Sequence, residues 1–187
     1  VNLILVRHGQ SQWNLENRFT GWYDAKLTNN GLEEARKAGL LIKNLGLKSN
    51  YGFTSYQTRA IKTFETILKT SDIKILNIIK AWQLNERHYG SLQGLNKDET
   101  AKKHGKEQVM IWRRSYDIPP PAQNRDDPEH PVNLKLYSNI DPELVPDSES
   151  LKDTYNRTVP YYNENIKPLL KKSENVLISA HGNSLRA

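Results

Sequence analysis

Cysteine is absent from the 187 residues of this chain, and methionine occurs only once. Without cysteine there are no disulfide bonds, no cysteine-based zinc sites and no thiol nucleophile, and a reducing compartment such as the cytoplasm is expected. No stretch approaches the roughly 20 apolar residues that cross a bilayer, and the first residues become polar too early for a secretory signal. We therefore expect a soluble, cytoplasmic protein with no membrane partner.

The composition indicates one folded domain. Hydrophobic residues make up 36% of the chain, charged residues 26% and aromatic residues 9%, which is typical of a packed globular protein rather than a disordered one. The length fits a single domain that spans residues 1–187. The net charge of +6 favours anionic partners without specifying their kind.

Hydrophobic patterning predicts strands that alternate with helices. Nearly continuous apolar runs at 1–6 and 175–180 predict strands buried on both faces, and further strands are expected at 51–54 and within 73–81. This alternation predicts an α/β fold: a three-layer sandwich in which helices cover both faces of a mostly parallel central sheet.

The helices are expected between these strands. One begins after the N-cap residue Thr28 and ends before Gly46, and a second covers about residues 57–69. The spacing at 96–116 is also helical, with a break near Gly105. These helices supply the outer layers of the predicted sandwich.

The remaining chain combines an irregular segment with another helical region. Seven of the nine prolines fall within residues 117–147, which predicts an irregular excursion long enough to cover a site. Residues 148–172 are expected to be helical, with Ser148 as the N-cap and with kinks at Pro160 and Pro168.

Histidine–glycine pairs follow two of the predicted strands. His8 comes directly after the first strand, and His181 comes directly after the last. Ligands of parallel α/β sheets bind outside the carboxyl ends of the strands, where both histidines are expected to meet. One such pair is weak evidence, because a lone histidine is more often structural, but two pairs at matching strand ends indicate a site.

Arginines and one glutamate supply further signals. Each arginine can hold phosphate oxygens with two parallel hydrogen bonds, although any one of them alone is more often a solvated surface charge. Glu86 follows a predicted strand, where a partly buried carboxyl group serves as a general acid or base; pairing with a neighbour such as Arg87 is the structural alternative. The arginines are Arg7, Arg59, Arg113 and Arg114.

Two other classes of function fit less well. A zinc site built from His8, His88 and His181 lacks the short ligand spacings of metal motifs and leaves the arginines unexplained. Nucleic-acid binding is disfavoured because the basic residues are dispersed among acidic ones. The four tryptophans are expected to pack in the core or to line the site, and His104 and His130 are expected at the surface.

Five segments together resemble the cofactor-dependent phosphoglycerate mutases of the histidine phosphatase superfamily. The resemblance runs from residue 1 to residue 187, with the motifs in the order and spacing of the family. ERHYGSLQG is the segment most specific to the mutase branch. The segments are LVRHGQSQWNLENRFTGW, SYQTRA, LNERHYGSLQGLNK, WRRSY and SAHGNSLRA.

The resemblance implies a division of catalytic roles. His8 matches the nucleophile that becomes phosphorylated, and Glu86 matches the proton donor and acceptor for the substrate hydroxyl. Arg7, Arg59 and His181 match the residues that surround the transferring phosphoryl group. The family chemistry requires no metal.

The resemblance also implies which residues of this chain contact the substrate. Within this set, Lys97, Arg113 and Arg114 suit the carboxylate and the second phosphate of a small acid. Gln10 departs from the family pattern, since many members have glutamate after Arg-His-Gly. The full set comprises Asn14, Thr20, Gly21, Arg87, Tyr89, Lys97, Arg113, Arg114, Gly182 and Asn183.

By this resemblance, the chain is expected to be an isomerase of glycolysis and gluconeogenesis. It would interconvert 3-phosphoglycerate and 2-phosphoglycerate after priming by 2,3-bisphosphoglycerate, with small phosphorylated acids as its partners and no nucleic acid. The alternative is a phosphomonoester phosphatase of the same superfamily. The resemblance also implies a homodimer or homotetramer, and a family domain that continues beyond Ala187 in a C-terminal segment.

Overall fold

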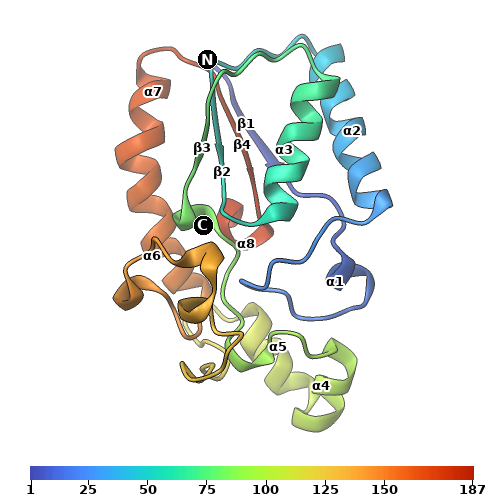
Figure 1. Ribbon diagram of the computed structural model, residues 1–187, viewed down its shortest axis with the longest axis vertical. Coiled ribbons are helices and arrows are strands. Elements are labelled where there is room, and N and C mark those ends of the chain that lie inside the picture. Colours follow the sequence, from blue (N-terminus) through green and yellow to red (C-terminus); the bar gives the residue numbers. More distant parts are fainter.

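The central sheet is parallel throughout (Figure 1). The structure, a computed structural model, describes residues 1–187, and its strands lie in the order β1-β4-β2-β3. The strands are β1 (Leu3–Arg7), β2 (Tyr51–Thr54), β3 (Ile78–Lys80) and β4 (Val176–Ala180). This order confirms the predicted parallel sheet and makes the first and last strands neighbours.

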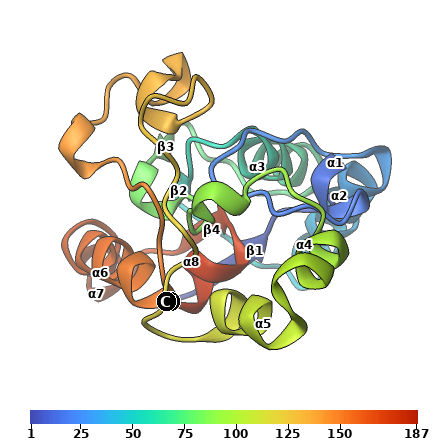
Figure 2. The same ribbon diagram turned by 90° about the horizontal axis from the view of Figure 1, so that it is seen from below.

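Helices cover both faces of the sheet, as predicted (Figures 1 and 2). On one face lie α2 (Asn29–Asn44) and α3 (Thr58–Thr70), and on the other lie α6 (Leu151–Tyr161) and α7 (Lys167–Lys171). None of the helices combines the length and the apolar character needed to cross a membrane. The helices near the carboxyl ends of the strands are α1 (Gln12–Leu15), α4 (Lys97–His104), α5 (Lys106–Arg114) and α8 (Gly182–Arg186).

The core lies on both sides of β4, whose residues are all buried. Leu177 packs with Phe64 of α3 on one face, whereas Ile178 packs in a cluster with Ile166 on the other. Successive side chains of a strand point to opposite faces, so a continuous apolar run is what a strand between two helical layers requires. The prediction of a fully buried strand at 175–180 is confirmed.

The same prediction is wrong for residues 1–6. Ile4 and Val6 pack against the cluster under α2 and α3, but Leu3 and Leu5 are 39% and 49% exposed. β1 lies at the edge of the sheet, with β4 as its only neighbouring strand. On its other face an apolar groove separates β1 from α6, so this face is not covered.

The predicted helix ends are mostly confirmed. The Thr28 hydroxyl accepts a hydrogen bond from the Gly31 N–H (3.0 Å) and caps α2, and Gly46 follows the helix with φ of +63°. Side-chain capping and a left-handed glycine are the standard solutions for the unpaired groups at helix ends. The break near Gly105, which separates α4 from α5, is also confirmed.

The cap of α6 is Ser150 rather than the predicted Ser148. The Ser150 hydroxyl accepts from the Asp153 N–H, and the Asp153 carboxylate accepts from the Ser150 N–H, which completes a capping box. Ser148 instead donates its hydroxyl proton to the Pro120 carbonyl. After α6 the chain passes through a π-helical turn at Tyr162–Ile166 into α7.

The proline-rich segment 117–147 is irregular, as predicted, but it is packed against the rest of the molecule. Its Tyr137 contacts the fully buried Trp22 within an apolar cluster. The expectation that His130 is a surface residue is wrong, because it is fully buried with Nε2 3.0 Å from the Asp147 carboxylate. Short 3-10 turns form at Pro131–Asn133, Lys135–Tyr137 and Pro142–Leu144.

Candidate active site

The two predicted histidines meet at the carboxyl ends of β1 and β4. Arg7 pairs with Ala180 in the parallel register, and the backbone N–H of His8 donates to the Ala180 carbonyl (3.0 Å). The rings of His8 and His181 consequently lie side by side, with centroids 5.0 Å apart. The structure thus confirms that both histidine–glycine pairs share one edge of the sheet.

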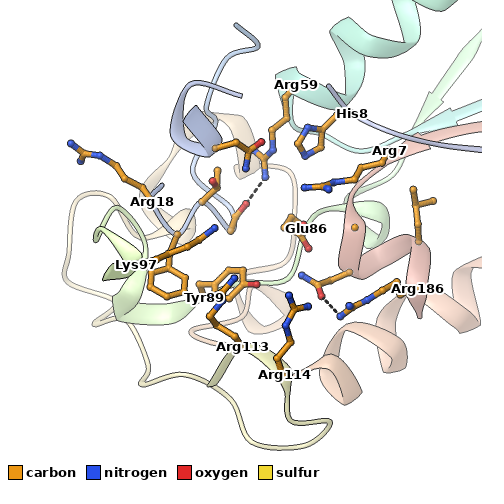
Figure 3. A pocket seen from close by; sticks show the side chains of 17 residues that line it. Arg7, His8, Arg18, Arg59, Glu86, Tyr89, Lys97, Arg113, Arg114 and Arg186 are labelled. Atoms are coloured by element: carbon orange, nitrogen blue, oxygen red, sulfur yellow. Dashed lines mark hydrogen bonds between the residues drawn. The ribbon is translucent and has the colours of Figure 1, made fainter. Parts of the chain in front are cut away.

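A cleft of about 500 Å³ opens beside His8 (Figure 3). All but two of the residues predicted for the site line it, although they come from segments far apart in the sequence. The 117–147 segment contributes no lining residue. The predicted residues that line the cleft are Arg7, His8, Asn14, Thr20, Gly21, Arg59, Glu86, Tyr89, Lys97, Arg113, Arg114, Gly182 and Asn183.

The two exceptions are Arg87 and His181. Arg87 is buried away from the cleft, where its guanidinium donates to the Trp112 carbonyl (2.8 Å) and lies 4.5 Å from the ring of Tyr89. Arg87 contacts the end of α5 and is not among the residues that line the cleft, so its place in the substrate site stays a prediction. His181 is fully buried beside His8 and does not itself line the cleft.

His8 has one ring nitrogen bound and the other without a protein partner. Its Nδ1 donates to the carbonyl of Gly9 (2.6 Å), which places the proton there and leaves the lone pair on Nε2. Burial and the nearby charge of Arg59 lower the pKa of His8 to about 3, against only a weaker opposing effect of the hydrogen bond to Gly9. His8 is therefore neutral at physiological pH, with Nε2 able to act as a nucleophile.

Close backbone packing holds His8 in place. The Gly9 N–H donates to the Thr63 hydroxyl (3.2 Å) on α3. A side chain on Gly9 would come within 2.1 Å of the Gly31 carbonyl oxygen, so only glycine allows α2 to approach this turn. The glycine after the histidine is explained by this contact with the helix.

The proton position on His181 follows from its neighbours. The Ser55 hydroxyl lies 2.7 Å from Nε2 of His181 and accepts from the backbone N–H of Gln57 (3.1 Å). The Ser55 hydroxyl donates its own proton to Nε2 of His181. The His181 proton therefore lies on Nδ1, which has no hydrogen-bond partner in the protein. Burial and the charge of Arg59 hold the pKa of His181 well below its ordinary value, so this ring is neutral.

Arg59 is held by two backbone carbonyls. It lies on the first turn of α3, almost completely buried, and donates to the carbonyls of Gly21 (2.8 Å) and Tyr23 (2.9 Å). Gly21 has φ of +55°, and a side chain there would come within 2.2 Å of the Gln93 amide oxygen. The glycine thus brings its carbonyl to Arg59, which fixes a positive charge beside His8.

The charge in the cleft is strongly asymmetric. Glu86 is its one acidic residue, while seven residues are arginine or lysine. In Figure 3, Glu86 lies between two groups of cations. The inner cations, beside His8, are Arg7 and Arg59; the outer cations, on the opposite wall, are Lys97, Arg113 and Arg114; the other two are Arg18 and Arg186.

The positive charges of the outer cations repel one another. Burial and the neighbouring charges of Arg113 and Arg7 lower the pKa of Lys97, because each charged group disfavours another of the same sign. A bound anion relieves this repulsion, so the outer wall is suited to a second negative group at a distance from His8.

The chain is similar over most of its length to known proteins. A family model described as "Histidine phosphatase superfamily (branch 1)" matches residues 3–134. The 2,3-bisphosphoglycerate-dependent phosphoglycerate mutase 2 of Lactiplantibacillus plantarum is 54% identical over 187 residues, which are 100% of this chain and 81% of that protein. The 2,3-bisphosphoglycerate-dependent phosphoglycerate mutase of Hydrogenobaculum sp. is 54% identical over 185 residues, 99% of this chain and 75% of that protein. The chain belongs to this mutase family within the histidine phosphatase superfamily.

Solved structures share the fold with this member of the mutase family. A phosphoglycerate mutase from Bacillus anthracis matches with a TM-score of 0.71 and 23% identity over 99% of this chain and 76% of that one. A mycobacterial glucosyl-3-phosphoglycerate phosphatase matches with a TM-score of 0.71 and 21% identity over 98% and 77%. Mutases and phosphatases thus share the architecture, and the 54% identical relatives favour the mutase over the phosphomonoester phosphatase.

Four lining residues of this mutase-family chain were not among the predicted ones. Arg186 donates to the Asn183 side chain (2.8 Å), and Arg18 donates to the Gly94 carbonyl (3.2 Å). Both lie within the motif segments, but nothing in their local pattern separates them from solvated surface charges. The four residues are Arg18, Phe19, Leu185 and Arg186.

Gln10, which departs from the family pattern, does not line the cleft. Its side-chain oxygen accepts from the Thr28 hydroxyl (3.0 Å) at the start of α2. The substitution therefore acts on the helix start rather than on a ligand in the cleft. No group of three or more histidine, aspartate or glutamate side chains is arranged as a metal site.

We expect the stability of this mutase-family protein to fall as the pH drops below 6.5. Burial lowers the pKa of both His8 and His88 to about 3, whereas their ordinary value is 6.5. Between these values the unfolded chain binds more protons than the folded one, so stability is complete above pH 6.5 and is lost toward pH 3. Each histidine contributes about 1.4 kcal/mol per pH unit in this window.

Urea unfolding, followed by tryptophan fluorescence between about pH 8 and pH 5, measures this dependence. The midpoint should be nearly constant at the upper end and should fall steadily below pH 6.5. A midpoint that stays constant down to pH 5 would contradict neutral, buried histidines.

Proposed function

We propose that this chain interconverts 3-phosphoglycerate and 2-phosphoglycerate through a phosphohistidine at His8. The observation that carries the proposal is the neutral His8 ring, whose free Nε2 lies in a cleft with one acid and two groups of cations. The names of the 54% identical relatives support the same reaction. The fold alone does not, because phosphatases share it.

Phosphoryl transfer to His8 needs a nucleophile, a charge-stabilising environment and a proton source. The lone pair of Nε2 forms the N–P bond while the P–O ester bond breaks, and the departing oxygen takes a proton from Glu86. Arg7 and Arg59 stabilise the charge on the equatorial phosphoryl oxygens, and the Nδ1–H of His181 supplies a neutral donor beside them. In the return step a substrate hydroxyl attacks phosphorus and gives its proton back to Glu86.

Isomerisation requires a ligand with two phosphorylation positions to stay bound while the phosphoryl group moves. The inner cations suit the phosphoryl group at His8, and the outer cations suit the carboxylate and the second phosphate. A phosphatase has no need of the outer group, because water is its acceptor. The outer cations therefore support the mutase reaction over simple hydrolysis.

The primer 2,3-bisphosphoglycerate fits the same charge distribution. It carries two phosphates and one carboxylate, and the cleft provides seven cations against a single carboxylate. The inner cations would hold one phosphate and the outer cations the other end. When bound, the primer supplies the phosphoryl group that first loads His8; no residue arrangement in the cleft calls for a metal.

We also propose that residues 1–187 belong to one domain of a cytoplasmic enzyme, which assembles into a homodimer or homotetramer. The family membership supports this assignment. Small phosphorylated acids are its proposed partners, because seven of the 27 lysines and arginines line this one cleft.

Phosphorus NMR tests the proposed reaction directly. With enzyme, EDTA and a catalytic amount of 2,3-bisphosphoglycerate, the 3-phosphoglycerate resonance should be replaced in part by that of 2-phosphoglycerate. Omitting the bisphosphate should slow the onset, because His8 then starts without a phosphoryl group. Release of inorganic phosphate without the 2-isomer would instead assign a phosphatase, and inhibition by EDTA would require a metal.

A further inference from the structure

Gln57 is a fully buried polar residue with no role in the mechanism above. It precedes α3, two residues before Arg59 in sequence, and does not line the cleft. Its side-chain oxygen accepts from the backbone N–H of Glu86 (2.9 Å), and its side-chain nitrogen donates to the Gly21 carbonyl (2.9 Å). One amide group thus joins two cleft segments that lie 65 positions apart in the sequence.

The Gly21 carbonyl is also the one that holds Arg59. Both of its lone pairs are used, one by the Arg59 guanidinium (2.8 Å) and the other by Gln57. A short chain of hydrogen bonds therefore runs from Arg59 through Gly21 and Gln57 to the peptide of Glu86. The two bonds to the Gly21 carbonyl are buried and the bond to the Glu86 N–H is partly buried, so loss of the Gln57 amide leaves polar groups without a partner.

The other hydrogen bonds of the Glu86 peptide act on its carbonyl. That oxygen accepts from Trp22 Nε1 (2.7 Å) and from the guanidinium of Arg157 (2.8 Å). These contacts anchor Glu86 to Trp22 and to α6, but neither reaches the Gly21 carbonyl that holds Arg59. Gln57 alone links the Glu86 N–H to that carbonyl.

We propose that Gln57 is a positioning residue for the reaction, which sets the Glu86 carboxyl group at the correct distance from the phosphoryl group held by the inner cations. This inference rests on the proposed function of Glu86 as acid and base. Proton transfer to a departing oxygen needs hydrogen-bond contact, and a misplacement of about 1 Å reduces a rate by about a hundredfold. A single amide that joins the acid to the phosphate site meets this need.

A double-mutant cycle tests the proposal. Gln57→Met keeps a side chain of similar length but removes both hydrogen bonds, and it should lower kcat for isomerisation by about tenfold to a hundredfold with little change in KM. In the Glu86→Gln background the same change should cost almost nothing further, because no acid is left to position. Equal losses in both backgrounds would overturn the proposal, since they would show a general effect on the fold.

Ser49→Ala is the control. It removes the hydrogen bonds from the buried Ser49 hydroxyl to the carbonyls of Tyr51 (2.9 Å) and Asn175 (3.1 Å) at the start of β2, and it leaves every contact of Gln57 in place. Its melting temperature should fall, and its kcat should remain that of the wild type. A comparable loss of kcat in this control would assign the Gln57→Met effect to stability and overturn the positioning role.

Gln57→Glu covers the case in which Gln57→Met does not fold. A protonated carboxyl group accepts from the Glu86 N–H and donates to the Gly21 carbonyl, whereas a carboxylate only accepts. The ratio of variant to wild-type kcat should therefore rise several-fold as the pH is lowered from about 8 to about 6. A ratio independent of pH would overturn the proposal.

Failure of the proposed function gives a different result. In that case the wild type itself would not isomerise 3-phosphoglycerate. The same cycle is then measured on release of inorganic phosphate from 3-phosphoglycerate, which also requires a proton for the departing oxygen. Coupling between Gln57 and Glu86 in that reaction would support the positioning role, and additivity would overturn it.

Discussion

His8→Ala should abolish both the uptake of phosphate by the protein and the isomerisation of 3-phosphoglycerate. The variant lacks the free ring nitrogen of the cleft, because His181 lies outside the lining and its unprotonated Nε2 is hydrogen-bonded to the Ser55 hydroxyl (2.7 Å). Without the N–P bond, transfer would have to occur directly between two substrate oxygens, which have no activated nucleophile. Activity should fall to the background of the assay.

Labelling with 2,3-bisphosphoglycerate that carries radioactive phosphate measures the first step alone. Phosphohistidine is labile to acid and stable to base, so the wild-type label should be lost in acid, and His8→Ala should take up none. His104→Ala is the control, because that histidine is exposed on α4 and does not line the cleft. Acid-labile label retained by His8→Ala would place the nucleophile elsewhere.

The pairing of the two histidines could be predicted because it depends on sheet geometry alone. Parallel strands place their carboxyl ends at one edge, and the apolar runs before His8 and His181 identify those strands without knowledge of the packing. The same reasoning failed for the outer surface of β1. Leu3 and Leu5 have the apolar character of a buried strand, but whether a layer covers them depends on neighbours that the run itself does not encode.

Whether an individual polar side chain is buried or lines the cleft could not be predicted, for a related reason. Arg87 and Arg114 are both arginines within the motif segments, yet one is buried behind α5 and the other lines the cleft. His130 has no motif around it but is buried beside Asp147 by the irregular segment that folds over it. Gln57 is similar: its importance follows from two hydrogen bonds to distant segments, which no local pattern shows.

Glu86→Gln should reduce isomerisation by a factor of about 10² to 10⁴, the usual contribution of a general acid or base. Glutamine keeps the size of the side chain and an oxygen that accepts from the Arg87 N–H, as Glu86 Oε1 does (2.7 Å). It cannot give a proton to the departing oxygen or take one from the attacking hydroxyl. The backbone contacts to Gln57, Trp22 and Arg157 are unaffected, so the loss should fall on kcat rather than on KM.

The choice of leaving group separates this role from an effect on binding. Departing p-nitrophenolate is stable without a proton, so the first-turnover release of p-nitrophenol from p-nitrophenyl phosphate, which ends at phosphorylated His8, should be nearly unchanged in Glu86→Gln. A sugar-acid alkoxide, in contrast, cannot leave unprotonated. Glu107→Gln, the same change at an exposed position on α5, should affect neither reaction. Equal losses on both substrates would mean that Glu86 acts by shaping the cationic cleft, because a proton donor matters only when the leaving group needs the proton.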